Sequence, residues 1–191
     1  MEIDNIFEKM NFESKIELEE MPELDLYMDQ VIQLFESKLS LLKRTEDEKI
    51  LTKTMINNYA KGKLLIPIKN KKYSKDHLII MALIYNLKGA LSINDIKSSL
   101  DNIIENYNDG EYPIRELYQC YLKESDEDIK ELKENLELKM KKIEDRVSQS
   151  ENINGEFEKN FLLLCSLVNM SNMYRRLSEK LIDDFFTKNN E

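Results

Sequence analysis

The sequence has few of the residues that interrupt helices or carry catalysis. Its 191 residues include no tryptophan, 3 prolines, 4 glycines, 2 cysteines and 1 histidine. Because glycine and proline interrupt regular helices, their scarcity predicts long helices with few sharp turns. Metal centres and nucleophilic active sites usually draw on clusters of cysteine and histidine, so this composition argues against both.

The few cysteine and histidine residues have no catalytic spacing. Cys120 and Cys165 stand apart in apolar helical patterns, which predicts buried free thiols in a reducing compartment. His77 follows Asp76 and lies near many lysines, and a surface position fits it better than the role of a catalytic base, which needs a positioned partner. We therefore expect no enzyme, no catalytic residues, no metal and no cofactor.

Long hydrophobic runs are also missing. The longest, residues 161–168, is too short to cross a bilayer. Residues 1–10 carry acids and no sustained apolar core, so we expect no signal peptide. With 41% hydrophobic and 34% charged residues, the composition is that of a globular protein. These features predict a cytoplasmic protein without a membrane partner.

Acidic residues are absent from one window. Residues 49–75 contain eight lysines and no aspartate or glutamate, a charge of +8 in a chain of net charge −9, which leaves −17 elsewhere. A local basic surface can bind phosphate on an acidic protein, because the local field and counterion release matter more than total charge. A solvated loop in a lysine-rich protein is the alternative explanation.

Apolar spacing predicts a mainly α fold with at most one small β-wing. Steps of three and four predict helices over residues 24–44, 52–61, 74–88, 92–107, 113–121, 126–147 and 156–186. The helix after Ser74 is apolar on almost every side, so it should form the centre of the core. Thr52 can cap the second helix, and capping-box patterns begin at Ser92 and Ser125.

The segment between residues 62 and 73 differs in character from the helices around it. Leu64–Ile68 is apolar and β-prone, and Lys69–Lys72 is typical of a turn, so a two-stranded hairpin is expected. We expect three regions: a flexible arm (1–20), a winged-helix domain (21–110) and a helical dimerisation or interaction region (111–191). The heptad-like seam from Ile129 to Val147 favours a long C-terminal helical hairpin as the homodimer contact.

A pattern of residues between 52 and 100 carries a family resemblance. The positions concerned are Tyr59, Leu64, Leu65, Pro67, Tyr73, Ser74, Leu78, Ile84, Leu87, Ser92 and Ile96. In this order they resemble the winged helix-turn-helix domain of MerR-type regulators, which implies duplex DNA as a partner. Asn57 replaces the arginine, and Lys63 the glycine, that are usual there. Residues 22–30 followed by 55–59 look like an uncharacterised family from Gram-positive bacteria, catalogued as a domain of unknown function.

The resemblance and the charge pattern together give a candidate DNA-binding surface. The expected contact residues are Thr52, Lys53, Thr54, Asn57, Asn58, Lys61, Lys63, Lys69, Lys71, Lys72 and Tyr73. Short polar side chains on a helix can contact phosphates or base edges, asparagine being suited to adenine, and lysines neutralise phosphates. Plain surface or capping roles explain Asn57 and Asn58 equally well.

Two functions stay open. The first is a DNA-binding transcriptional regulator of unknown target that acts as a homodimer, its effector unknown. The second is a non-catalytic helical protein–protein interaction module, an adaptor or anti-regulator that retains a winged-helix shape. The missing arginine and the acidic remainder of the chain favour the second. Small-molecule binding by the C-terminal helices would require a cavity, which sequence does not reveal.

Overall fold

The computed structural model describes residues 3–108, 110 and 112–187, and it is mainly helical, as expected. The helices are α1 (Ile3–Met10), α2 (Met28–Leu39), α3 (Lys53–Lys61), α4 (Lys75–Leu87), α5 (Ile93–Asn108), α6 (Ile114–Ser148) and α7 (Glu156–Leu181). Short turns of 3-10 helix, η1 (Leu18–Glu20) and η2 (Ser40–Leu42), and a π-helical turn, η3 (Ile182–Phe186), complete them. The strands β1 (Leu26–Tyr27) and β2 (Lys72–Tyr73) form one antiparallel pair.

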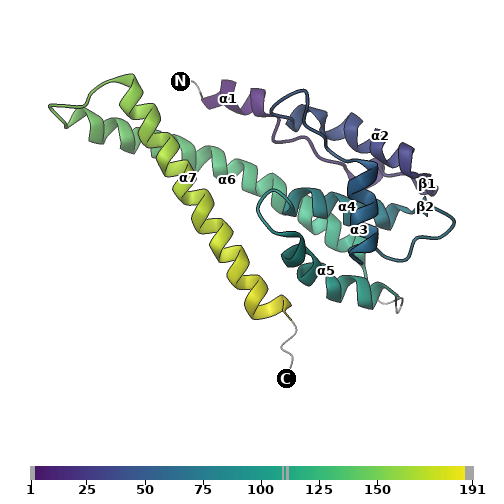
Figure 1. Ribbon diagram of the computed structural model, residues 1–191. Helices are drawn as coiled ribbons and strands as arrows, with labels where there is room; N and C mark the ends of the chain where they lie inside the picture. The colour runs from purple at the N-terminus through teal and green to yellow at the C-terminus, as the bar shows by residue number, and fades with distance from the viewer. Residues whose placement is uncertain (1–2, 109, 111, 188–191) are drawn as a thin grey trace.

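Helix α4 forms the centre of the core. Residues 78–82 and Ile84 are buried, and α2, α3, α5 and the first turns of α6 surround them (Figure 1). The prediction of a central apolar helix is confirmed. Burial of this many aliphatic side chains is the main source of stability for the fold, at roughly 25 cal/mol per Å² of apolar surface.

The N-terminal boundaries of the inner helices follow the capping residues seen in the sequence. The Thr52 hydroxyl accepts a hydrogen bond from the Met55 amide at 3.2 Å. Ser92 and Asp95 bond reciprocally, at 3.2 Å in each direction between backbone amide and side chain. Each bond satisfies an amide that the first helical turn leaves without a partner, which explains why these helices begin where they do.

Residues 16–21 pack on the core, whereas we expected residues 1–20 to form a flexible arm. Ile16 and Met21 are each 1% exposed, and the Tyr118 hydroxyl on α6 donates a hydrogen bond to the Ile16 carbonyl at 2.7 Å. The segment is attached because its apolar side chains find a buried site against α6. Residues 1–2 lie outside the described residues.

Helix α6 is one continuous helix of 35 residues, so the predicted break near residue 125 is wrong. The pattern at Ser125 resembles a capping box, but no glycine or proline lies nearby to stop the preceding turns. The start of α6 buries Ile114, Tyr118 and Leu122 in the main core, which therefore crosses the boundary expected at residue 110. Its far half forms a second, small cluster in which Leu136, Ile143 and Val147 meet Leu163 of α7.

Helix α7 turns back from the end of α6 and diverges from it, and the turn that follows it, η3, reaches α5 (Figure 1). The sequence predicted a final helix over residues 156–186, but it did not predict that most of the apolar side chains of α7 would be exposed. Cys165 on α7 and Cys120 on α6 are both exposed, so the prediction of buried thiols is wrong. Among the described residues, no helix combines the length and apolarity needed to span a membrane.

The expected hairpin is different from the observed one. Leu64, Leu65 and Ile66 are buried in the core as irregular chain and form no strand. Instead β2 pairs with β1, with Leu26 opposite Tyr73 and Tyr27 opposite Lys72. Sequence reasoning missed this pairing because β1 lies far away in the chain, inside a segment whose spacing predicted a helix.

Candidate functional site

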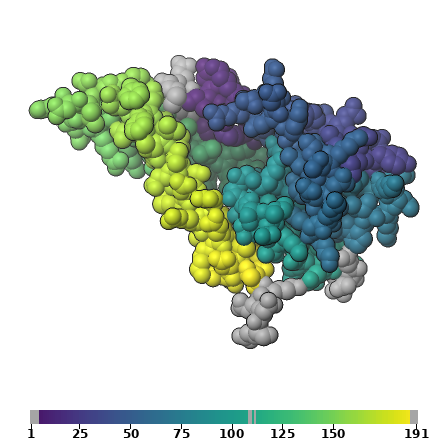
Figure 2. Space-filling view, in the orientation of Figure 1, coloured from purple at the N-terminus to yellow at the C-terminus, as the bar shows by residue number. Residues whose placement is uncertain are grey.

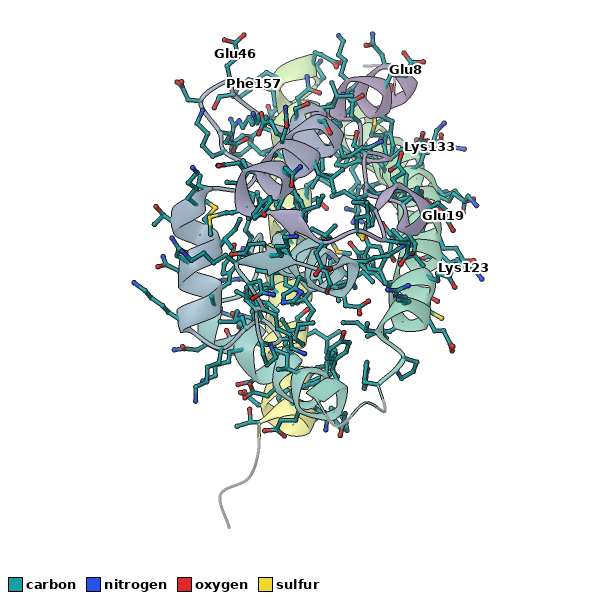
Figure 3. The ribbon with its side chains drawn as sticks, turned by 90° about the vertical axis from the view of Figure 1, so that its right-hand side faces the viewer. Glu8, Glu19, Glu46, Lys123, Lys133 and Phe157 are labelled. Carbon is teal, nitrogen blue, oxygen red and sulfur yellow. The ribbon has the colours of Figure 1, made fainter. Side chains whose placement is uncertain are left out.

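Helix α3 presents one polar face to solvent. Its apolar residues Ile56 and Tyr59 point into the core, while the opposite face is exposed. The exposed residues on α3 are Lys53, Thr54, Asn57, Asn58 and Lys61. They recur at the three- and four-residue steps that align side chains on one side of a helix. Figure 3 shows α3 at the outer left edge of the molecule, with its side chains directed outward.

The end of α3 is shaped by two backbone hydrogen bonds. The Leu64 amide bonds to the Tyr59 carbonyl at 2.9 Å and the Lys63 amide to the Ala60 carbonyl at 3.2 Å, a Schellman motif. Lys63 therefore adopts a left-handed φ of 59°. Glycine is the usual residue at this position of a Schellman motif, because it adopts a positive φ without steric cost. A Cβ on neighbouring Gly62 would stand only 2.6 Å from Leu64 Cδ1.

A tight turn before β2 displays further lysines. Lys69 and Lys72 form a bridge, and the two residues between them, Asn70 and Lys71, have φ angles of 53° and 57°. Two consecutive left-handed residues are the signature of a type I′ hairpin turn. Lys69, Asn70 and Lys71 are exposed at its tip, and Lys72 Nζ lies 5.2 Å from the centre of the Tyr27 ring.

Some expected contact residues have structural roles. Tyr73 is 4% exposed and packs edge-on against His77, with ring centres 5.7 Å apart, so its side chain does not reach the surface. Thr52 is half-buried and its hydroxyl caps α3. Lys75, one of the eight lysines of the window, is buried and its ammonium bonds to Glu23 at 2.7 Å.

Carboxylates border the lysine-bearing surface at three places. Lys53 forms an exposed ion pair with Asp29 of α2 at 2.7 Å. Lys63 shares a surface cavity of about 410 Å³ with Asp101 and Glu105 of α5. Lys69 and Lys72 of the turn share a further cavity, of about 400 Å³, with Asp25.

His77 is buried, so the prediction that it lies on the surface is wrong. Its Nδ1 accepts a hydrogen bond from the Ser74 amide at 3.1 Å and lies 2.8 Å from the Ser74 hydroxyl, which fixes the start of α4 directly after β2. Burial lowers the pKa of His77, although the backbone of Ile66 and the Asp25 carboxylate oppose the shift. The imidazole is therefore a neutral capping group.

An ion-pair network joins the start of α4, and Glu23 in the segment before β1, to α6. Arg115 Nε on α6 bonds to Asp76 of α4 at 2.9 Å, and its Nη1 bonds to Glu23 at 3.2 Å. The Tyr107 hydroxyl donates to Asp76 at 2.6 Å, and burial together with this bond raises the pKa of Tyr107 to about 12. No spacing in the sequence indicates this network, because its members are up to 92 residues apart.

Comparison with known proteins identifies a family but no relative of known function. No curated protein and no solved structure matches the chain. A family model described as a domain of unknown function, DUF1836, matches residues 16–121, more than half of the chain. The matched residues begin at buried Ile16 and end one residue before Leu122, the limits of the main core. The chain therefore belongs to the DUF1836 family.

Proposed function

We propose that the protein is a DNA-binding transcriptional regulator of unknown target, which contacts duplex DNA through α3 and the turn at residues 69–72. The observation that carries the proposal is that the exposed face of α3 and the tip of the turn display lysine, asparagine and threonine and no acid of their own. Such a surface suits phosphate oxygens and base edges.

The order of elements supports a winged-helix interpretation. Strand β1, helices α2 and α3, the hairpin turn with β2, and helix α4 follow one another in the order of a winged helix, although residues 40–52, with η2 among them, separate α2 from α3 in place of a short turn. In this interpretation α3 enters the major groove, where Asn57 and Asn58 reach bases. The turn lies along the neighbouring backbone, where Lys69 and Lys71 neutralise phosphates.

A homodimer through α7 completes the proposal. Residues 160–174 contain no charged residue, although this part of α7 is exposed on nearly every side. Leu164, Val168 and Met173 are 56%, 51% and 50% exposed. An uncharged, exposed apolar helix is typical of an interface. A second copy related by a twofold axis would cover it without leaving charges buried, and would present two copies of α3 to two half-sites.

The test is a gel-shift titration with random duplex DNA at low salt. Lys71→Glu with Lys72→Glu reverses two charges at the turn, and we expect DNA affinity to fall at least about tenfold, with a smaller slope of affinity against salt. The matched control is Lys141→Glu with Lys142→Glu, an exposed lysine pair on α6, which should lose much less. Equal affinity of parent and turn variant would overturn the proposal.

The interaction-module alternative is favoured by one observation, the acids beside the basic surface. Asp29 pairs with Lys53, and Asp101 and Glu105 share a cavity with Lys63. These carboxylates weaken the attraction of that side of α3 for phosphate. A protein that shows no gel shift at low salt, but forms a defined complex with another protein, would support an adaptor or anti-regulator.

A further inference from the structure

A cavity lies between the main core and the end of α7. Its volume is about 690 Å³, within the range of small-molecule sites. Helices α4, α5 and α6 form its floor and η3 forms one side. Figure 2 shows the yellow end of the chain, which includes η3, lying against the teal helices.

Aromatic rings and aliphatic groups line this cavity. Tyr112, Tyr121, Phe185 and Phe186 contribute rings, and Leu83 and Leu87 lie on the α4 side. Phe185 and Phe186 are 75% and 47% exposed, because η3 carries them to the rim while Ile182 alone anchors this turn in the protein. Exposed adjacent rings at the rim of a cavity are costly in water, and a ligand with an apolar body would cover them.

The charge of the lining selects the ligand. Asp101 is the acidic group of the lining, and no lysine or arginine belongs to the described lining residues. Asp101 also borders the neighbouring cavity that contains Lys63, and its carboxylate forms no hydrogen bond or ion pair among the residues that the structure describes. Aromatic faces attract cations through their quadrupole, and a carboxylate attracts them directly. The net charge of −9 adds a field of the same sign.

We propose that the cavity between α4, α5, α6 and η3 is a binding site for an amphipathic organic cation, with an aromatic or alkyl body against the aromatic side chains and its charge near Asp101. The site stands independently of DNA binding. If both hold, a bound cation contacts α4 and α5 of the DNA-facing unit and also the end of the dimer helix.

Calorimetric titration of the full chain, without DNA, with two probes of nearly equal shape and opposite charge tests the proposal. Tetraphenylphosphonium should bind with a dissociation constant below about 1 mM, at least about tenfold tighter than tetraphenylborate. Asp101→Asn should reduce that preference to about twofold. The control is Glu151→Gln, which removes one negative charge in the exposed loop between α6 and α7. This variant should retain the full preference for tetraphenylphosphonium over tetraphenylborate.

A second pair of variants tests the location. Phe185→Ala should weaken tetraphenylphosphonium binding about tenfold. Phe157→Ala, 76% exposed at the start of α7, should leave tetraphenylphosphonium binding unchanged (Figure 3). Equal binding of the two probes, or equal losses in the two phenylalanine variants, would overturn the proposal. If the parent chain gives no gel shift with duplex DNA but still binds tetraphenylphosphonium, only the proposed DNA-binding function would be overturned.

Discussion

At the scale of single residues, His77 is the only histidine, so its titration can be observed without overlap. Its folded-state pKa lies below the ordinary value of 6.5 because the imidazole is buried. At pH values between the folded-state and the unfolded-state pKa of His77, the unfolded chain binds more protons than the folded one. The free energy of unfolding therefore rises with pH in this interval. The stability linked to His77 is complete above pH 6.5 and is lost as pH falls through the folded pKa.

We therefore predict that the free energy of unfolding, measured by urea denaturation, falls as pH is lowered from 7.5 to 5, by at most about 1.4 kcal/mol per pH unit. His77→Gln keeps an acceptor for the Ser74 amide and should remove the slope. The lowered pKa values of Glu20 and Glu23 affect stability mainly below about pH 5, so they add little to the slope above that pH. An unchanged slope in the variant, or an imidazole pKa at or above 6.5 by NMR, would contradict the prediction.

Two residues of the lysine-rich segment 49–75, Tyr73 and Lys75, are buried although their neighbours in the sequence are polar or charged. Tyr73 and Lys75 occur in a basic, polar stretch, yet β2 and the first turn of α4 direct both into the protein. A lysine can be buried when its ammonium reaches a carboxylate, as Lys75 reaches Glu23. Local composition does not contain that information, because Glu23 is 52 residues away.

At the scale of elements, the end of α3 predicts opposite effects for two glycine substitutions. Lys63 is left-handed, so Lys63→Gly should stabilise the fold by roughly 0.5–1 kcal/mol. Lys61 closes α3 in helical conformation, so Lys61→Gly should destabilise it by a similar amount. Both variants lose one exposed charge. Urea midpoints that move in the same direction would contradict the observed cap.

Caps and breaks differ in how well sequence predicts them. Thr52, Ser74 and Ser92 begin helices because preceding glycines or turns leave amides to be satisfied. Ser125 has the same pattern, but α6 continues through it, because no glycine or proline before Ser125 ends the helical turns that precede it. A capping residue starts a helix only when no helix is already present.

At the scale of the whole molecule, the charges at the two ends of α7 predict the orientation of the proposed dimer. Glu156, Glu158 and Lys159, the last of which pairs with Glu144 of α6, precede the uncharged residues 160–174, and Arg175 and Arg176 follow them. Antiparallel pairing about the middle of this segment sets acids opposite arginines, whereas parallel pairing sets like charges together.

We predict that the parent chain sediments as a dimer and that Val168→Glu, near the middle of the segment, weakens it at least about a hundredfold by burying two carboxylates. Leu138→Glu changes a leucine on α6 that is 58% exposed, against 51% for Val168, and should leave the dimer intact. Arg175→Glu with Arg176→Glu should weaken the dimer, and adding Glu156→Lys with Glu158→Lys should restore it. A monomeric parent at tens of micromolar, or no restoration, would contradict this arrangement.

The sequence by itself determined the helical class, the central position of α4, the caps at Thr52 and Ser92, and the exposed polar face of α3. These follow from short-range causes: periodicity, hydrogen bonding within one turn, and charge along a helix. Only the tertiary structure decided the β1–β2 pairing, the burial of His77 and Lys75, the Arg115 network and the cavity beside η3. Each joins residues distant in the chain, and single-segment patterns do not encode which distant partner a side chain meets.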